Sequence, residues 1–168
     1  MDGGCKNPES LKNEVDQYIY IGDVPLIKKA VNSKYKGLGE AYMLLEAIRN
    51  VEIADYYFKL SGRYFLNDNF KLTNFEFSAF NFRNYTKRNI SIAKTEYVKG
   101  SHSTRLYGIP GEKLSQYEKS LKKSLKELRI GMGIEYVMPK YLKKEKIYYL
   151  DKLGVAGYCG VDKTYIDE

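Results

Sequence analysis

Apolar residues recur at helical spacing in two stretches of the chain. Over residues 38–50 they fall three and four positions apart, and over residues 114–128 they do so again, with lysines on the opposite face. Gly131 and Gly133 follow the second stretch and interrupt its pattern. The sequence therefore predicts two amphipathic helices.

Short runs rich in aromatic and β-branched residues predict the strands. They cover residues 17–21, 54–60, 74–80, 89–93, 104–109 and 146–150. The first helix lies between the first two runs, a β-α-β succession that is typical of parallel strands. We therefore predict an α/β fold with a mixed, mainly parallel sheet flanked by helices, built as one domain over residues 1–168.

The composition fits a folded domain of this size. At 168 residues, 43% hydrophobic and 29% charged, it speaks against a disordered tail or a disulfide scaffold. Cys5 and Cys159 are the only cysteines and lack CxxC spacing. No apolar run approaches the roughly 18 residues of a membrane helix, and the first residues lack the apolar core of a signal peptide. We expect a cytoplasmic protein, or one in a host cytoplasm if its source is a virus.

Basic residues outnumber acidic ones by 28 to 21, which gives a formal net charge of +7. Such a balance favours anionic partners, including nucleic acid and phosphorylated small molecules, although it also serves solubility. The excess is spread along the chain, with no helix-turn-helix pattern, no RNP-like signature and no continuous basic stripe. Nucleic-acid binding is therefore the less favoured reading.

Several familiar catalytic motifs are missing from the sequence. It has no Walker A motif, no GxGxxG and no HExxH. The single histidine, His102, cannot form a histidine cluster for zinc. It lies in a polar run, residues 99–103, which predicts a loop.

The motif KGLGE, Lys36 to Glu40, stands directly before the first predicted helix. Free backbone N–H groups at a helix N-terminus favour phosphate, which makes this motif a candidate phosphate contact. The alternative is that Gly37 and Gly39 only shape the entry to the helix.

A second motif, KLSGRY from Lys59 to Tyr64, ends the strand that follows this helix. In parallel α/β sheets, ligands bind at the carboxyl ends of strands. Arg63, together with Lys59, would clamp a diphosphate, because guanidinium groups match phosphate oxygens. The alternative is that Arg63 is a surface ion-pair partner.

The two motifs together resemble those of glycosyltransferase-like proteins from bacterial surface-polysaccharide loci and some large viruses. These proteins are related to the GT-A type of nucleotide-sugar-dependent glycosyltransferase, a Rossmann-related fold. The resemblance extends to a DGG-like turn, a TxLY-like strand, a GIE-like element and an LGVxG segment. The matching residues are Asp2 to Gly4, Lys36 to Glu40, Lys59 to Tyr64, Thr104 to Tyr107, Gly133 to Glu135 and Leu153 to Gly157.

The resemblance implies transfer of a sugar from a nucleotide-diphosphate donor to a hydroxyl acceptor. It implies donor or phosphate contacts at Asp2, Lys36, Gly37, Glu40, Lys59, Ser61, Gly62 and Arg63. Glu135 is the candidate catalytic base, with a surface glutamate at a helix start as the alternative. Glu40 would contact sugar hydroxyls or cap its helix.

The chain departs from the GT-A pattern at the metal site. Ser61-Gly62-Arg63 stands where a DxD motif would hold a divalent metal. We therefore expect metal-independent donor binding with Arg63 as the phosphate contact, while Mn²⁺ or Mg²⁺ stays open as a cofactor.

Against the same pattern, the chain begins at the DGG-like turn, without the opening β-α unit of the fold. We expect an N-terminally truncated GT-A-like domain whose activity on its own is in question. A non-catalytic binding module and a basic nucleic-acid-binding protein are the alternatives.

Overall fold

The computed structural model describes residues 13–85, 101–159 and 163–168, which group into two compact units. The first unit comprises Met1–Glu52, described from residue 13, and Glu118–Met138. The second comprises Ile53–Tyr117 and Pro139–Glu168. The strand expected over residues 89–93 lies outside the described residues.

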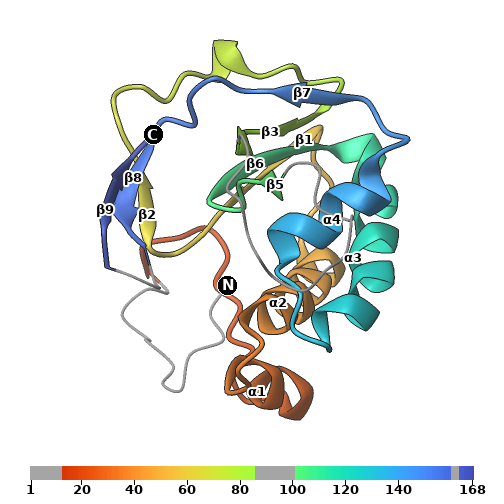
Figure 1. Ribbon diagram of the computed structural model, residues 1–168. Coiled ribbons are helices and arrows are strands. Elements are labelled where there is room, and N and C mark those ends of the chain that lie inside the picture. Colours follow the sequence, from red (N-terminus) through yellow and green to blue (C-terminus); the bar gives the residue numbers. More distant parts are fainter. Residues whose placement is uncertain (1–12, 86–100, 160–162) are drawn as a thin grey trace. The chain divides into compact units, whose positions relative to one another are not determined.

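The first unit is helical. It contains α1 (Pro25–Val31), α2 (Lys36–Asn50), most of α3 (Leu114–Leu128) and the start of α4 (Ile134–Leu142). Figure 1 shows α1 beside α2, and the two helices are in contact. The buried apolar side chains of this unit are Ile21, Ile27, Ala30, Ala41, Leu45, Leu121, Leu128, Ile134, Val137 and Met138.

Both helices predicted from apolar spacing are confirmed, α2 starting two residues earlier than expected. The end of α3 follows from its glycine. Gly131 has a φ of 96° and donates its backbone N–H to Leu128 O, while Met132 donates to Glu127 O. This pair of bonds is a Schellman motif, which favours glycine in the left-handed conformation.

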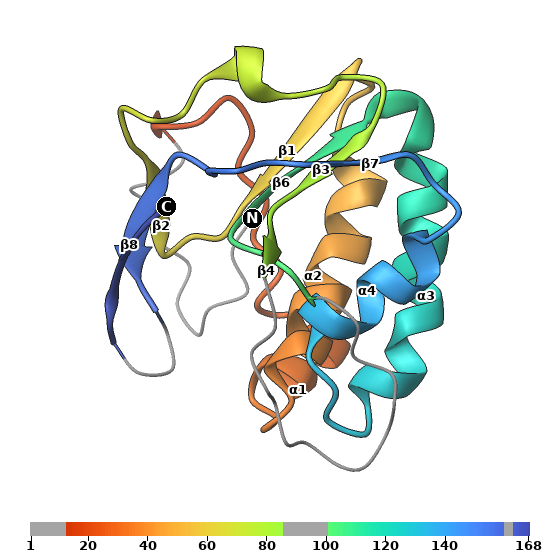
Figure 2. The same cartoon turned by 45° about the horizontal axis from the view of Figure 1, so that its top comes forward.

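The second unit contains three β-sheets. The largest has the strand order β1 (Tyr56–Leu60), β6 (Leu106–Pro110), β3 (Phe80–Phe82) and β7 (Ile147–Tyr149), as Figure 2 shows. A second sheet joins β2 (Tyr64–Leu66), β8 (Val155–Tyr158) and β9 (Tyr165–Asp167). A short pair joins β4 (Asn84–Tyr85) to β5 (Ser101–His102). Two 3₁₀ turns, Leu72–Asn74 and Gly111–Lys113, complete the unit.

The α/β class with a mixed sheet is confirmed, but the prediction of mainly parallel strands is wrong. Only β3 and β7 pair in parallel, and every other pairing described is antiparallel. Residues 17–21 form no strand apart from an isolated bridge at Tyr20, so α2 is no crossover between two parallel strands.

The prediction of a strand over residues 74–80 is also wrong, because Asn81 stabilises a turn there. Its amide oxygen accepts the backbone N–H of Glu76, and its amide nitrogen donates to the carbonyl oxygens of Glu76 and Ala79. Asn81 is fully buried. These side-chain bonds take up backbone groups that a strand would use, so β3 begins only at Phe80.

Candidate functional site

The KGLGE motif forms the first turn of α2, where its residues make packing contacts. Lys36 Nζ donates to the carbonyl oxygen of Val31, the last residue of α1, at 3.1 Å. A Cβ on Gly37 would lie 3.0 Å from the backbone nitrogen of Ile134, and one on Gly39 would lie 3.1 Å from Val31 Cα. The motif therefore allows α2 to lie close to α1 and to the start of α4.

This close approach brings two of the predicted site residues together in the first unit. Glu40 lies one turn beyond Gly37 on α2, and Glu135 follows Ile134 in the first turn of α4. Burial raises the pKa of Glu135; a hydrogen bond from its own backbone N–H opposes this, and the negative charge of Glu40 adds to it. The two glutamates therefore form a carboxylate pair that lies partly out of solvent.

The carboxyl group of Glu135 folds back over the turn that precedes its helix. A Cβ on Gly133 would lie 2.7 Å from Glu135 Oε1, so a side chain at position 133 would displace the carboxylate. A carboxylate with a raised pKa is a stronger base than one in water, and its protonated form is available as an acid nearer to neutral pH. The arrangement is suited to taking or giving one proton.

In the second unit, Lys59 and Ser61 connect β1 to the segment before β6. Lys59 Nζ donates to Ser61 Oγ at 2.7 Å and to the carbonyl oxygen of Thr104 at 2.6 Å. Ser61 Oγ also donates to that carbonyl oxygen, at 3.0 Å. The Lys59 ammonium is therefore engaged in holding the end of β1, which limits its capacity to bind a diphosphate.

Gly62 and Arg63 form the exposed turn between β1 and β2. A Cβ on Gly62 would meet no atom within 4 Å, so packing does not require glycine there. Among the described residues, the Arg63 side chain has no ion pair, which gives no support to the surface ion-pair alternative. Its guanidinium is accessible to an anion from solvent.

The predicted site residues thus form two local groups. The first unit holds Lys36, Gly37, Glu40 and Glu135, and the second holds Lys59, Ser61, Gly62 and Arg63. Asp2 lies outside the described residues. Among the residues that the structure describes, no three His, Cys, Asp or Glu side chains group so as to hold a metal ion.

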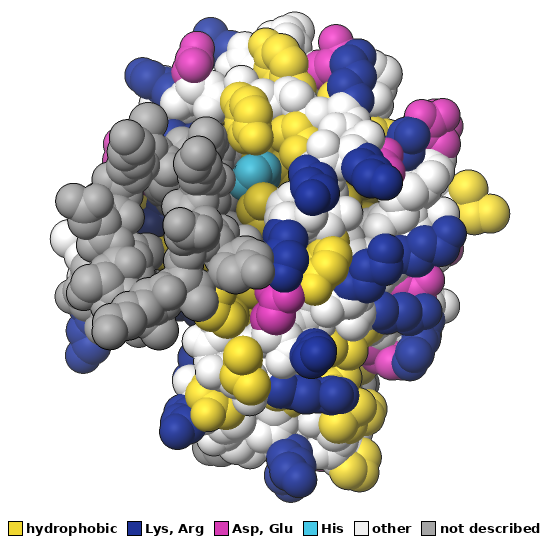
Figure 3. All heavy atoms as spheres, turned by 45° about the vertical axis from the view of Figure 1, so that its right-hand side comes forward, with side chains coloured by type: hydrophobic (Ala, Val, Ile, Leu, Met, Phe, Trp, Pro, Cys, Tyr) yellow, Lys and Arg dark blue, Asp and Glu magenta, His cyan; other side chains and the backbone are white. Residues whose placement is uncertain are grey.

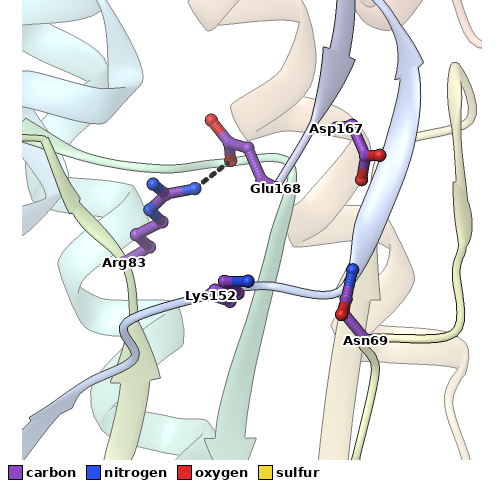
Figure 4. A pocket seen from close by; sticks show the side chains of 5 residues that line it. All are labelled: Asn69, Arg83, Lys152, Asp167 and Glu168. Atoms are coloured by element: carbon purple, nitrogen blue, oxygen red, sulfur yellow. Dashed lines mark ion pairs between the residues drawn. The ribbon is translucent and has the colours of Figure 1, made fainter.

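A cavity of about 220 Å³ in the second unit was not predicted from the sequence. It is lined by Asn69, Arg83, Lys152, Asp167 and Glu168, whose side chains Figure 4 shows. No motif links these positions, because they come from separate loops and strand ends. The only signal in the sequence was the general excess of basic residues.

His102 lies on β5 and is 4% exposed, so the prediction of a loop histidine is wrong. Its ring contacts those of Phe82 and Tyr149, at centroid distances of 4.6 and 5.5 Å. Neither ring nitrogen has a hydrogen-bond partner among the described residues. Burial lowers the pKa of His102 to about 4, which keeps the ring neutral near pH 7.

The basic side chains form no single stripe on the face drawn in Figure 3. Dark blue Lys and Arg side chains are spread over that face, with magenta Asp and Glu side chains between them. None of the described helices has the length and apolar character needed to cross a membrane.

No protein-family model, no curated protein and no solved structure matches the chain.

Proposed function

We propose that the chain is a glycosyltransferase-like protein in which Glu135 takes the proton of an acceptor hydroxyl. The observation that carries the proposal is the partly buried Glu135 carboxylate, whose pKa is raised beside Glu40. Its support from the sequence is the resemblance of KGLGE and KLSGRY to the GT-A group. The GT-A-like fold and the nucleotide-sugar donor belong to this proposal.

In the proposed reaction, the acceptor oxygen attacks the anomeric carbon of the donor sugar while its proton moves to the Glu135 carboxylate. The bond between the anomeric carbon and the phosphate oxygen breaks, and the nucleoside diphosphate leaves with the electron pair. A base whose pKa lies nearer to the working pH accepts the proton more readily during this step. Glu40 contributes because its negative charge favours the protonated form of Glu135.

A contact between Arg63 and the donor diphosphate is a separate part of the proposal. It rests on the exposure of Arg63 and on the fit between guanidinium and phosphate oxygens. Lys59 is less suited to this role, since its ammonium already donates to Ser61 and Thr104. The cytoplasmic location stays a prediction from the sequence.

The test is a panel of UDP-, GDP- and CDP-sugars, read by thermal shift and by release of nucleoside diphosphate. We expect one donor to stabilise the protein, Arg63→Ala to weaken that binding, and Glu135→Gln to stop turnover while leaving binding intact. Glu118→Gln, at a partly buried carboxylate on α3 that pairs with Lys122, is the matched control. Transfer by Glu135→Gln at the wild-type rate would contradict the role of the base.

The same panel, extended by a set of oligonucleotides, decides between the alternatives. Donor binding without turnover by the wild-type chain would favour a non-catalytic module. Tight, salt-sensitive binding of oligonucleotides with no donor binding would replace the transferase proposal by nucleic-acid binding.

A further inference from the structure

Two arginines of the second unit converge on one carboxylate. Arg83 follows β3 and Arg105 precedes β6, and these strands are neighbours in the large sheet, so both arginines lie at the same end of the strand pair. Arg105 Nη1 donates to Glu168 Oε1 at 2.5 Å, while Arg83 Nη1 lies 3.3 Å from Glu168 Oε2. The Glu168 side chain thus occupies the position of an anion between two guanidinium groups.

The two guanidinium groups differ in how many of their N–H groups make hydrogen bonds. Arg105 also donates from Nε to the Tyr64 hydroxyl, at 3.2 Å. Arg83 Nη1 and Glu168 Oε2 are both buried, yet neither makes a hydrogen bond within the described residues. The two atoms face each other in the ion pair at 3.3 Å without hydrogen-bond geometry, so a better aligned oxygen atom of a ligand would bind Arg83 more favourably than Glu168 Oε2 does.

The cavity beside Arg83 adds a second cation and an amide. Lys152 and Asn69 line it, and Lys152 is exposed. Asp167 also lines it, but its carboxylate accepts a hydrogen bond from Asn67 Nδ2 at 2.6 Å. The cavity lining holds two cationic and two anionic side chains. Displacement of Glu168 by a ligand would leave Arg83, Lys152 and the adjacent Arg105 facing one carboxylate, that of Asp167.

The size of the cavity limits the ligand. Since one water takes about 30 Å³ of liquid volume, the 220 Å³ of the cavity equal roughly seven waters. Pockets that enclose drug-sized ligands are larger, at about 300–1,000 Å³. A phosphate group or a small phosphate monoester fits within this volume.

We propose that this cavity is a binding site for a phosphate group, contacted by Arg83 and Lys152, and that the Glu168 carboxylate occupies the arginine pair until the ligand displaces it. Guanidinium forks match phosphate oxygens, and an ammonium adds a point charge. The cavity lining shares no residue with those assigned to sugar transfer, and the site does not depend on that proposal. The phosphate belongs either to a small soluble molecule or to a lipid headgroup.

Calorimetric titration of the chain with inorganic phosphate and with glycerol 3-phosphate, at constant ionic strength, tests the site. We expect saturable binding by the wild type and a loss of about tenfold or more in affinity for Arg83→Gln, the factor of one charge-assisted hydrogen bond. Glu168→Gln removes the competing charge and is expected to bind more tightly. Lys71→Gln, which removes an exposed charge from the same unit, is the control and is expected to stay within about twofold of the wild type.

Lys152→Gln keeps the test decisive if Arg83→Gln fails to fold, because Lys152 is exposed and its substitution leaves the ion pairs intact. Co-sedimentation with vesicles of phosphatidylcholine, with and without phosphatidic acid, distinguishes a lipid headgroup from a soluble phosphate. Binding in either arm that falls with Arg83→Gln or Lys152→Gln supports the site. No saturable binding in either arm, or an equal loss with Lys71→Gln, would overturn it.

Discussion

The carboxylate pair of the first unit and the arginine pair of the second handle charge in opposite ways. Glu40 and Glu135 carry the same charge, and partial burial makes ionisation of Glu135 unfavourable, so its protonation state responds to its surroundings. Arg83 and Arg105 both pair with the opposite charge of one carboxylate, that of Glu168. The first arrangement supports the proposed proton transfer, and the second supports the proposed exchange of Glu168 for a phosphate group.

The largest expected difference between the two regions is in how acid affects stability, because His102 lies buried in the second unit. The folded state lowers its pKa from 6.5 to about 4, so between these values the unfolded chain binds more protons. Stability is therefore lost as the pH falls from about 6.5 to 4, by up to about 3 kcal/mol. The measurement is urea unfolding at several pH values, in which His102→Phe is expected to lose this part of the pH dependence. Equal pH slopes in the variant and the wild type would contradict the burial of a neutral ring.

Single substitutions of the two arginines are expected to show that they contribute unequally to the free energy of unfolding. Arg105→Ala deletes donors to both Glu168 and Tyr64 and is expected to lower the free energy of unfolding by about 2 kcal/mol. Arg83→Ala deletes an ion pair without a hydrogen bond and is expected to lower it by about 1 kcal/mol or less. Urea unfolding at pH 7 measures both. A larger loss for Arg83→Ala would show that the arginine next to the cavity is the more firmly held one.

Gly37→Ala is expected to move Glu135 relative to Glu40 by displacing the start of α4. The added Cβ would lie 3.0 Å from the backbone nitrogen of Ile134, so α4 must shift by a few tenths of an ångström. We expect a loss of about 1 kcal/mol in stability and a pKa for Glu135 closer to its ordinary value. Ala47→Gly, on the same helix, is the control for a general loss of helix stability. A Glu135 pKa unchanged by Gly37→Ala would mean that the motif does not position the pair.

Glu135→Gln is expected to stabilise the first unit slightly at neutral pH. Because folding raises the pKa of this group, the folded state is favoured at low pH and loses that advantage as the pH rises above the unfolded value. A neutral amide avoids the loss, and we expect a gain of about 1 kcal/mol or less. Thermal unfolding at pH 5 and pH 8 measures it, with a larger gain expected at pH 8. Destabilisation at both values would assign Glu135 a structural role as an ionised carboxylate.

The two regions also differ in how far the sequence reveals them. The helices α2 and α3 follow from apolar spacing, whereas the proximity of Glu40 to Glu135, which the glycines of KGLGE allow, is seen only in the structure. In these helices, the apolar spacing of the sequence matches the side chains that the structure buries. The arginine pair gives no such signal, because residues 83, 105 and 168 meet only through the pairing of β3 with β6 and the placement of β9 beside β8.

The errors in the predicted sheet have a similar origin. Aromatic alternation over residues 74–80 favours a strand, but buried Asn81 bonds to the backbone of that segment and makes a turn. The polar neighbours of His102 favour a loop, but pairing of β5 with β4 places its ring against Phe82 and Tyr149. In both cases a tertiary contact outweighs the local preference, and such contacts cannot be read from composition or periodicity.

The most direct test of the carboxylate pair is an NMR titration of the Glu135 side-chain carboxyl carbon in the wild type and in Glu40→Gln. We predict a Glu135 pKa above its ordinary value of 4.5 in the wild type, because of burial and the charge of Glu40, and a lower value in Glu40→Gln. Glu118→Gln is expected to leave it unchanged. A Glu135 pKa at or below 4.5 in the wild type would contradict the pair and remove the main support for Glu135 as the base.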